Sequence, residues 1–187
     1  MKTDRLNVSK KVYDSLQAQY GRPDMLTVEF DHREFYGHVL AANDLYIGIN
    51  STALDATKAK GQSFVVPEDC LFSALQVMID DGSAPQDLTL RIGTSSDLSS
   101  YLAEYTGSVI GTPGKWATIL GDRSLHLSRE TTYYLGLIKS SPTDDFKINL
   151  NLVDIYAGGG YCGGGTGWAM TPVSSWDLNF RIYGDLT

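Results

Sequence analysis

The residues best suited to ligand binding lie in the stretch DIYAGGGYCGGGTGWAM, residues 154–170, where glycines alternate with aromatic side chains. Glycine permits positive φ and a close backbone approach to a ligand, and aromatic rings stack on the C–H faces of sugars. The candidate ligand-binding residues, which lie in or beside this stretch, are therefore Tyr156, Tyr161, Trp168 and Trp176. In the alternative interpretation, the two tryptophans close one end of a hydrophobic core.

The glycines Gly158, Gly160 and Gly163 match the G-x-G-x-x-G spacing of dinucleotide-binding loops. Such a loop requires a helix directly after its last glycine, because the phosphate binds to the free N–H groups of that helix. Here more glycines follow, and then Thr171 and Pro172, a composition that disfavours a helix. The spacing therefore does not predict a nucleotide site.

Groups for nucleophilic catalysis are sparse. The histidines are His32, His38 and His126, no G-x-S-x-G motif occurs, and Cys162 has no histidine near it in the sequence. A nucleophile needs a base within hydrogen-bond reach. We therefore expect no enzymatic activity.

Two pairs of adjacent carboxylates, Asp80 with Asp81 and Asp144 with Asp145, are candidates for other chemistry. Paired carboxylates serve as acid and base in glycosidases, and clustered loop oxygens bind calcium. Both pairs stand beside turn-forming residues, which predicts that they face water. The alternative is a structural calcium ion at Asp80 and Asp81.

The cysteines Cys70 and Cys162 stand far apart, without the ligand spacing of a zinc or thioredoxin-like site. A disulfide between them and two separate thiols both remain open.

The net charge of −7 disfavours nucleic acid as a partner, since an acidic surface repels phosphates. No run of about 18 apolar residues predicts a membrane span. The first residues carry charges where a signal peptide has an apolar core. We therefore expect synthesis in a cytoplasm without export by the ordinary route.

The elements that would position these residues are mostly strands. Apolar residues recur every fourth position over about residues 7–20, which predicts one short helix. After it, alternation with period two predicts many short strands separated by turns, and between residues 95 and 107 a helical turn or an irregular crossing. The predicted strands span residues 25–30, 36–40, 45–49, 62–66, 71–79, 87–92, 115–120, 132–138, 146–152 and 178–183.

This pattern, without βαβ alternation, predicts an all-β fold, an antiparallel β-sandwich of the jelly-roll type with a short N-terminal helical arm. We expect residues 1–60 to be a docking segment and residues 61–187 to be the sandwich domain.

The segments GQSFVVPEDCLFSALQVMI, DLTLRIGTSS, GKWATIL, LHLSRETTYYLGLI and WDLNFRIYGD follow in an order that resembles jelly-roll modules of bacterial surface, secreted and virion proteins. The resemblance covers about residues 61–184 and extends to the architecture of carbohydrate-binding modules. It implies a fold and carries over no catalytic residue.

Together these features predict a non-enzymatic, virion-associated structural protein, a decoration or tail component. Its partners would be neighbouring virion subunits, further copies of itself in a homo-oligomer, and surface glycan. We expect no nucleic-acid partner, no membrane insertion and no cofactor beyond the calcium ion considered above. The alternative is a carbohydrate-binding module of a secreted or cell-surface protein.

Overall fold

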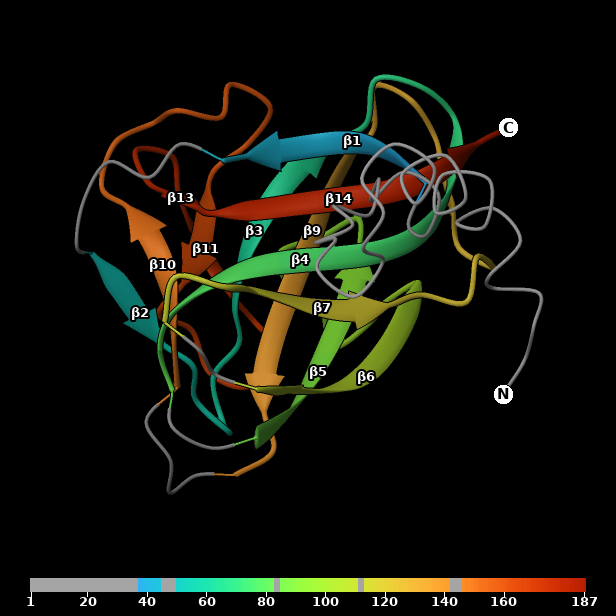
Figure 1. Ribbon diagram of the computed structural model, residues 1–187. Helices are drawn as coiled ribbons and strands as arrows, with labels where there is room; N and C mark the ends of the chain where they lie inside the picture. The colour runs from blue at the N-terminus through green and yellow to red at the C-terminus, as the bar shows by residue number, and fades with distance from the viewer. Residues whose placement is uncertain (1–36, 45–49, 83–84, 111–112, 142–145) are drawn as a thin grey trace, which may run out of the picture. The chain divides into compact units, whose positions relative to one another are not determined.

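The structure, a computed structural model, describes residues 37–44, 50–82, 85–110, 113–141 and 146–187 (Figure 1). These residues form an all-β, two-sheet antiparallel sandwich, and no helix occurs among them. The predicted helix at 7–20 and the predicted strands at 25–30 and 45–49 lie outside the described residues. No helix in the described part of the chain is long and apolar enough to cross a bilayer.

The larger sheet has eight strands, and β4, its longest strand, connects most of them. One edge of β4 pairs with β14 and then with β10, and the other edge pairs with β7 and β8. The members are β1 (His38–Asn43), β2 (Ser51–Ala53), β4 (Cys70–Gly82), β7 (Trp116–Leu120), β8 (His126–Leu127), β10 (Phe146–Asn151), β13 (Asp177–Leu178) and β14 (Phe180–Leu186).

The smaller sheet has six strands in the order β12-β11-β3-β9-β5-β6, all in antiparallel pairs. They are β3 (Lys60–Val65), β5 (Pro85–Gly93), β6 (Ala103–Ile110), β9 (Thr132–Lys139), β11 (Tyr161–Gly163) and β12 (Thr171–Val173).

Alternating side chains of both sheets fill one core. In β14, Phe180 and Ile182 are fully buried in this core, as the alternation predicts. The same holds for Leu88, Leu90 and Ile92 of β5.

The sandwich includes strands that precede residue 61. Strand β1 pairs with β14, and β2 pairs with β10, so both belong to the larger sheet. The segment from 95 to 107, expected to hold a helical turn or an irregular crossing, is irregular up to residue 102 and then contains the start of β6, which pairs with β5 over eight consecutive residues.

Candidate functional site

Two loops cover the outer face of the smaller sheet, the face turned away from the core. Gly136 lies on this face, between the core residues Leu135 and Leu137, and a Cβ built on it would meet Leu98 and Met170. The loop before β6 and the loop after β11 are joined by backbone bonds, from Leu98 N–H to Trp168 O (3.1 Å) and from Met170 N–H to Ser96 O (2.9 Å). They cover a second apolar cluster that contains Ala59, Leu98, Cys162 and Met170.

Arg91 of β5 lies between two aromatic rings at the border of this cluster. It alternates with the core residues Leu90 and Ile92, so its side chain points to the outer face. Its Cζ is 4.2 Å from the ring centroid of Trp168 and 4.3 Å from that of Tyr101. Guanidinium groups at this distance are attracted to the negative ring faces.

Two hydrogen bonds fix the guanidinium between the rings. Nε donates to Oε2 of Glu104 at 2.6 Å, and Nη1 donates to the carbonyl of Leu98 at 3.2 Å. Glu104 stands directly opposite Arg91 in the β5–β6 pairing, and such cross-strand pairs are close neighbours on one face. We call Tyr101, Arg91, Trp168 and Glu104 the Arg91 stack.

Part of the Arg91 stack is open to solvent. Tyr101 is 43% exposed, and the side chains of Arg91 and Glu104 are 19% and 36% exposed. Within the described part of the chain, no hydrogen bond uses Nη2 of Arg91 or Oε1 of Glu104. The surface therefore presents a donor, an acceptor and an aromatic ring in fixed positions, which suits a ligand that carries both hydroxyl groups and an apolar face.

The other predicted aromatic residues pack within the main core or against it. Tyr161 is 5% exposed, belongs to the main core and stacks on Trp176 at a centroid distance of 6.0 Å. Tyr156 meets the ring of Phe180 edge-on, and its hydroxyl bonds to both the N–H and the C=O of Val65. Of the four predicted ligand-binding residues, only Trp168 thus joins the Arg91 stack.

The glycines of residues 154–170 allow the chain to pack tightly against its neighbours. A Cβ built on Gly159 would lie 1.9 Å from the carbonyl oxygen of Ser63, and one on Gly165 would lie 1.7 Å from that of Ala169. No helix follows Gly163, so the arrangement that a nucleotide-binding loop requires does not form here.

A buried carboxylate holds the start of this stretch. Asp177, fully buried, accepts hydrogen bonds at Oδ2 from the backbone N–H groups of Ile155 (2.7 Å) and Tyr156 (2.8 Å). Its Oδ1 accepts a bond from Nε2 of Gln62 at 2.8 Å, and Oε1 of Gln62 accepts one from the N–H of Leu178. A buried charge is tolerated when it is fully bonded in this way.

The candidate calcium ligands have separate environments. Asp81 forms an ion pair with Lys147 at 3.1 Å. The register between β4 and β10 shifts at this point, so Asp80 is the extra residue of a β-bulge in β4. Asp80 lines a hollow of about 360 Å³ together with Met78, Ile79, Gly114 and Asn149. Among the described residues, no three His, Cys, Asp or Glu side chains are grouped as a metal ion would need. Asp144 and Asp145 lie outside the described residues.

The cysteines are two separate buried thiols, Cys70 on β4 and Cys162 on β11. Burial raises the pKa of Cys162 to about 12 and that of Cys70 to about 11. Both thiols stay protonated at neutral pH, so neither is a nucleophile there.

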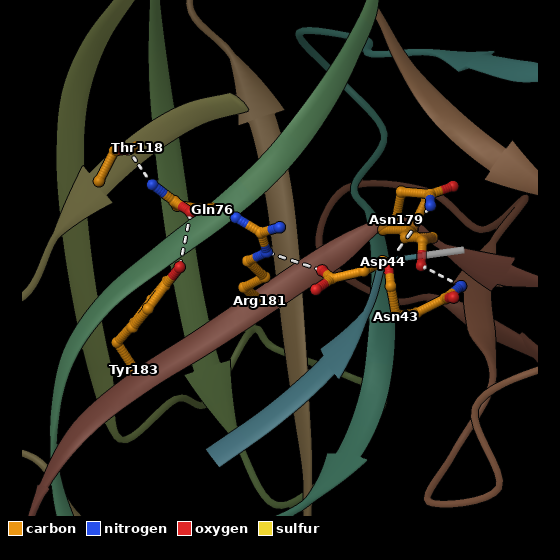
Figure 2. A network of polar contacts seen from close by, with 8 residues as sticks. Asn43, Asp44, Gln76, Thr118, Asn179, Arg181 and Tyr183 are labelled. Atoms are coloured by element: carbon orange, nitrogen blue, oxygen red, sulfur yellow. Dashed lines mark hydrogen bonds and ion pairs between the residues drawn. The ribbon is translucent and has the colours of Figure 1, made fainter. Parts of the chain in front are cut away.

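A second polar network lies on the outer face of the larger sheet (Figure 2). Tyr183 donates to Oε1 of Gln76 at 2.8 Å, and Nε2 of Gln76 donates to Thr118 at 3.1 Å, which links three neighbouring strands. Arg181 bonds to Asp44 at 2.7 Å and lies over the ring of Trp116 at 4.1 Å. Tyr183 and Gln76 are buried, so this network holds strands together and offers less open surface than the Arg91 stack.

No family model matches the sequence, and no curated protein shows significant similarity to it. The interpretation of the site therefore depends on its geometry.

Sequence reasoning missed Arg91, Glu104 and Tyr101. The available signal was the position of Arg91 within DLTLRI, where strict alternation places it on the face opposite the leucines. Its pairing with Glu104 requires the β5–β6 register, which the sequence did not reveal because β6 was not recognised as a strand.

Proposed function

We propose that this chain is a non-enzymatic binding module with a jelly-roll β-sandwich, and that it binds carbohydrate at the Arg91 stack. The jelly-roll assignment is supported by the connections: β3 and β9 lie in the smaller sheet, whereas β4 and β10, which directly follow them, lie in the larger one. Such crossings between two sheets are typical of jelly rolls.

One observation carries the proposal: the Arg91 guanidinium is fixed between Tyr101 and Trp168 beside a carboxylate and remains partly exposed. A sugar ring offers hydroxyl groups to Nη2 and to Oε1 of Glu104, and C–H groups to the exposed ring of Tyr101. Because the protein contacts already hold these groups in place, binding loses little side-chain entropy.

The virion setting is proposed from the sequence, on the resemblance of residues 61–184 to jelly-roll modules of surface and virion proteins. A glycan-binding surface on a displayed module is consistent with it. The same chemistry serves a carbohydrate-binding module of a secreted protein, and the Arg91 stack is common to both settings.

Glycan-array screening followed by calorimetric titration of the best ligand tests the site. We expect Tyr101→Ala to weaken binding about tenfold, since it removes the stacking ring. Arg91→Lys should also weaken binding, because lysine retains the charge but lacks the planar guanidinium group and its Nη2 donor.

The matched control is Leu102→Ala, which removes a somewhat more exposed apolar side chain next to Tyr101 and should leave affinity unchanged. Melting temperatures of all variants confirm that the fold is intact. Wild-type protein that binds no glycan on the array, or Tyr101→Ala protein that binds as tightly as wild type, overturns the proposal.

A further inference from the structure

Strand β6 forms one border of the smaller sheet, and no other described strand pairs with its outer edge (Figure 1). The N–H of Ser140 donates to the carbonyl of Asp87, so Asp87 and every second residue of β5 direct their backbone groups toward β9. Leu88, Leu90 and Ile92 therefore face β6 and bond to Gly107, Tyr105 and Ala103, their partners in the register.

The intervening residues of β6 direct their N–H and C=O groups away from the sheet. These residues are Glu104, Thr106, Ser108 and Ile110, and all four are exposed. Within the described part of the chain, β5 is the only strand with which β6 pairs. Unpaired edge groups of this kind are a template for another strand.

Most of the usual protections of an edge strand are missing from β6, and its one charged side chain, Glu104, is paired with Arg91. The strand contains no proline or lysine, and its register with β5 runs without a bulge from Ala103 to Ile110. The opposite border of the same sheet is different: β12 has only three residues, and one of them is Pro172. In the larger sheet, the register of the border strand β1 shifts between Val39 and Ala41. Natural sheets avoid edge pairing through such features.

We propose that β6 pairs antiparallel with β6 of a second copy of this chain, with Gly107 on the two-fold axis. In this register Thr106 faces Ser108 of the other copy, and Glu104 faces Ile110. All outward N–H and C=O groups of Glu104, Thr106, Ser108 and Ile110 then gain partners, since these residues form the hydrogen-bonded pairs of the new ladder.

The side chains suit this register. Glu104 is the only charged residue of β6, and the register places it opposite an isoleucine rather than opposite its own copy. Thr and Ser form a favourable cross-strand pair. Ile110, 71% exposed, gains an apolar contact with the methylene groups of Glu104 from the other copy. Gly107 has no side chain to collide at the axis, and isologous contacts of this kind close a dimer.

The pairing joins two smaller sheets into one continuous sheet, with the Arg91 stacks of both copies on its outer side. The dimer itself does not depend on the proposed function. If the stacks bind glycan, the dimer is bivalent and binds a multivalent surface more tightly than one copy does.

Sedimentation velocity of the full chain at concentrations up to about 500 µM tests the dimer, because an interface of one strand per copy belongs to the small and weak class. We expect a monomer–dimer equilibrium. Thr106→Pro should weaken it at least about tenfold, since it removes an outward N–H group and no bond to β5. The matched control is Thr106→Val, which retains the N–H group and should dimerise like wild type. A proline at Asp87 is not a suitable control, because it alters the interior of the sheet.

Gly107→Cys supplies a second test that does not depend on the folding of the proline variant. Mild oxidation should cross-link Gly107→Cys across the axis, whereas Asp87→Cys, on the neighbouring strand, should form no covalent dimer. The native thiols are buried and do not interfere. A monomer at all concentrations, a dimer unaffected by Thr106→Pro in a folded variant, or the absence of the Gly107→Cys cross-link overturns the proposal. Loss of glycan binding in Tyr101→Ala leaves each of these readouts unchanged, so the two proposals fail separately.

Discussion

Gln62 and Asp177 form a hydrogen bond of 2.8 Å between strands that belong to opposite sheets, and both side chains are fully buried. The carboxylate also binds the N–H groups of Ile155 and Tyr156. This pair therefore ties the two layers together and fixes the start of the glycine-rich stretch.

Asp177→Ala should lower the free energy of unfolding by about 3 kcal/mol or more, because it leaves several buried donors without an acceptor. Asp177→Asn should also destabilise, since one end of its amide is a donor facing other donors. Urea unfolding followed by tryptophan fluorescence measures the change. The exposed Asp154→Ala should stay within about 0.5 kcal/mol of wild type, and an Asp177→Ala protein as stable as this control would contradict the assigned role.

Gly159→Ala should destabilise the fold by several kcal/mol, roughly the magnitude of a severe core mutation. The added Cβ would lie 1.9 Å from the backbone oxygen of Ser63, which cannot move without displacing β3. Gly114→Ala is the matched control, because Gly114 has a φ of +72° and open space around a built Cβ. Only the left-handed backbone is then unfavourable for alanine, and this substitution should lower the free energy of unfolding by about 1 kcal/mol. Thermal melting of both variants checks the prediction, and equal losses would argue against a close approach at Gly159.

Stability should fall as the pH rises from 10 toward 12. Burial, followed by the charge of Asp122, raises the pKa of Tyr105 from 10.0 to about 12. Above pH 10 the unfolded tyrosine therefore loses its proton while the folded one keeps it, and stability declines until the pH passes the folded pKa. Tyr105→Phe cannot ionise and should show a shallower decline in melting temperature over this range. Some decline should persist, because burial also raises the pKa values of Tyr156 and Tyr161. Parallel curves for wild type and Tyr105→Phe would refute the assignment.

Neither thiol should react with Ellman's reagent in the native protein at pH 8. Both are fully buried, and their raised pKa values keep the thiolate fraction very small. In denaturant both cysteines should react at once without prior reduction, because they form no disulfide. Rapid modification of the native protein, or the need for a reductant after unfolding, would be the contrary result.

The sequence predicts the sandwich well where one face of a strand is apolar and the other polar. Strands β5 and β14 follow this rule, with Leu88, Leu90 and Ile92 in the core and Arg91 outside it. Strand β6 escaped prediction because its segment AEYTGSVI has small and polar residues on the exposed side and a glycine at a core-facing position, so the apolar alternation is weak.

The Arg91 stack could not be predicted from the sequence, for a physical reason. Aromatic composition identifies rings but not their surroundings: Tyr161 is part of the core, and Trp176 is partly buried and packs against it. The Arg91 stack joins three segments that are separate in the chain, and only the strand register and the loop contacts bring Tyr101 and Trp168 to the same guanidinium. The spacing of residues along the chain encodes neither the strand register nor the loop contacts.

The position of β14 has a consequence for biosynthesis. Strand β14, the last of the described strands, lies between β1, the first of them, and β4. Until β14 has left the ribosome, β1 lacks the neighbour with which it pairs, and the edge of β4 that binds β14 remains open. This layer therefore cannot close before β14 has been synthesised, and a nascent chain stalled shortly before residue 180 would expose unpaired strand edges to chaperones.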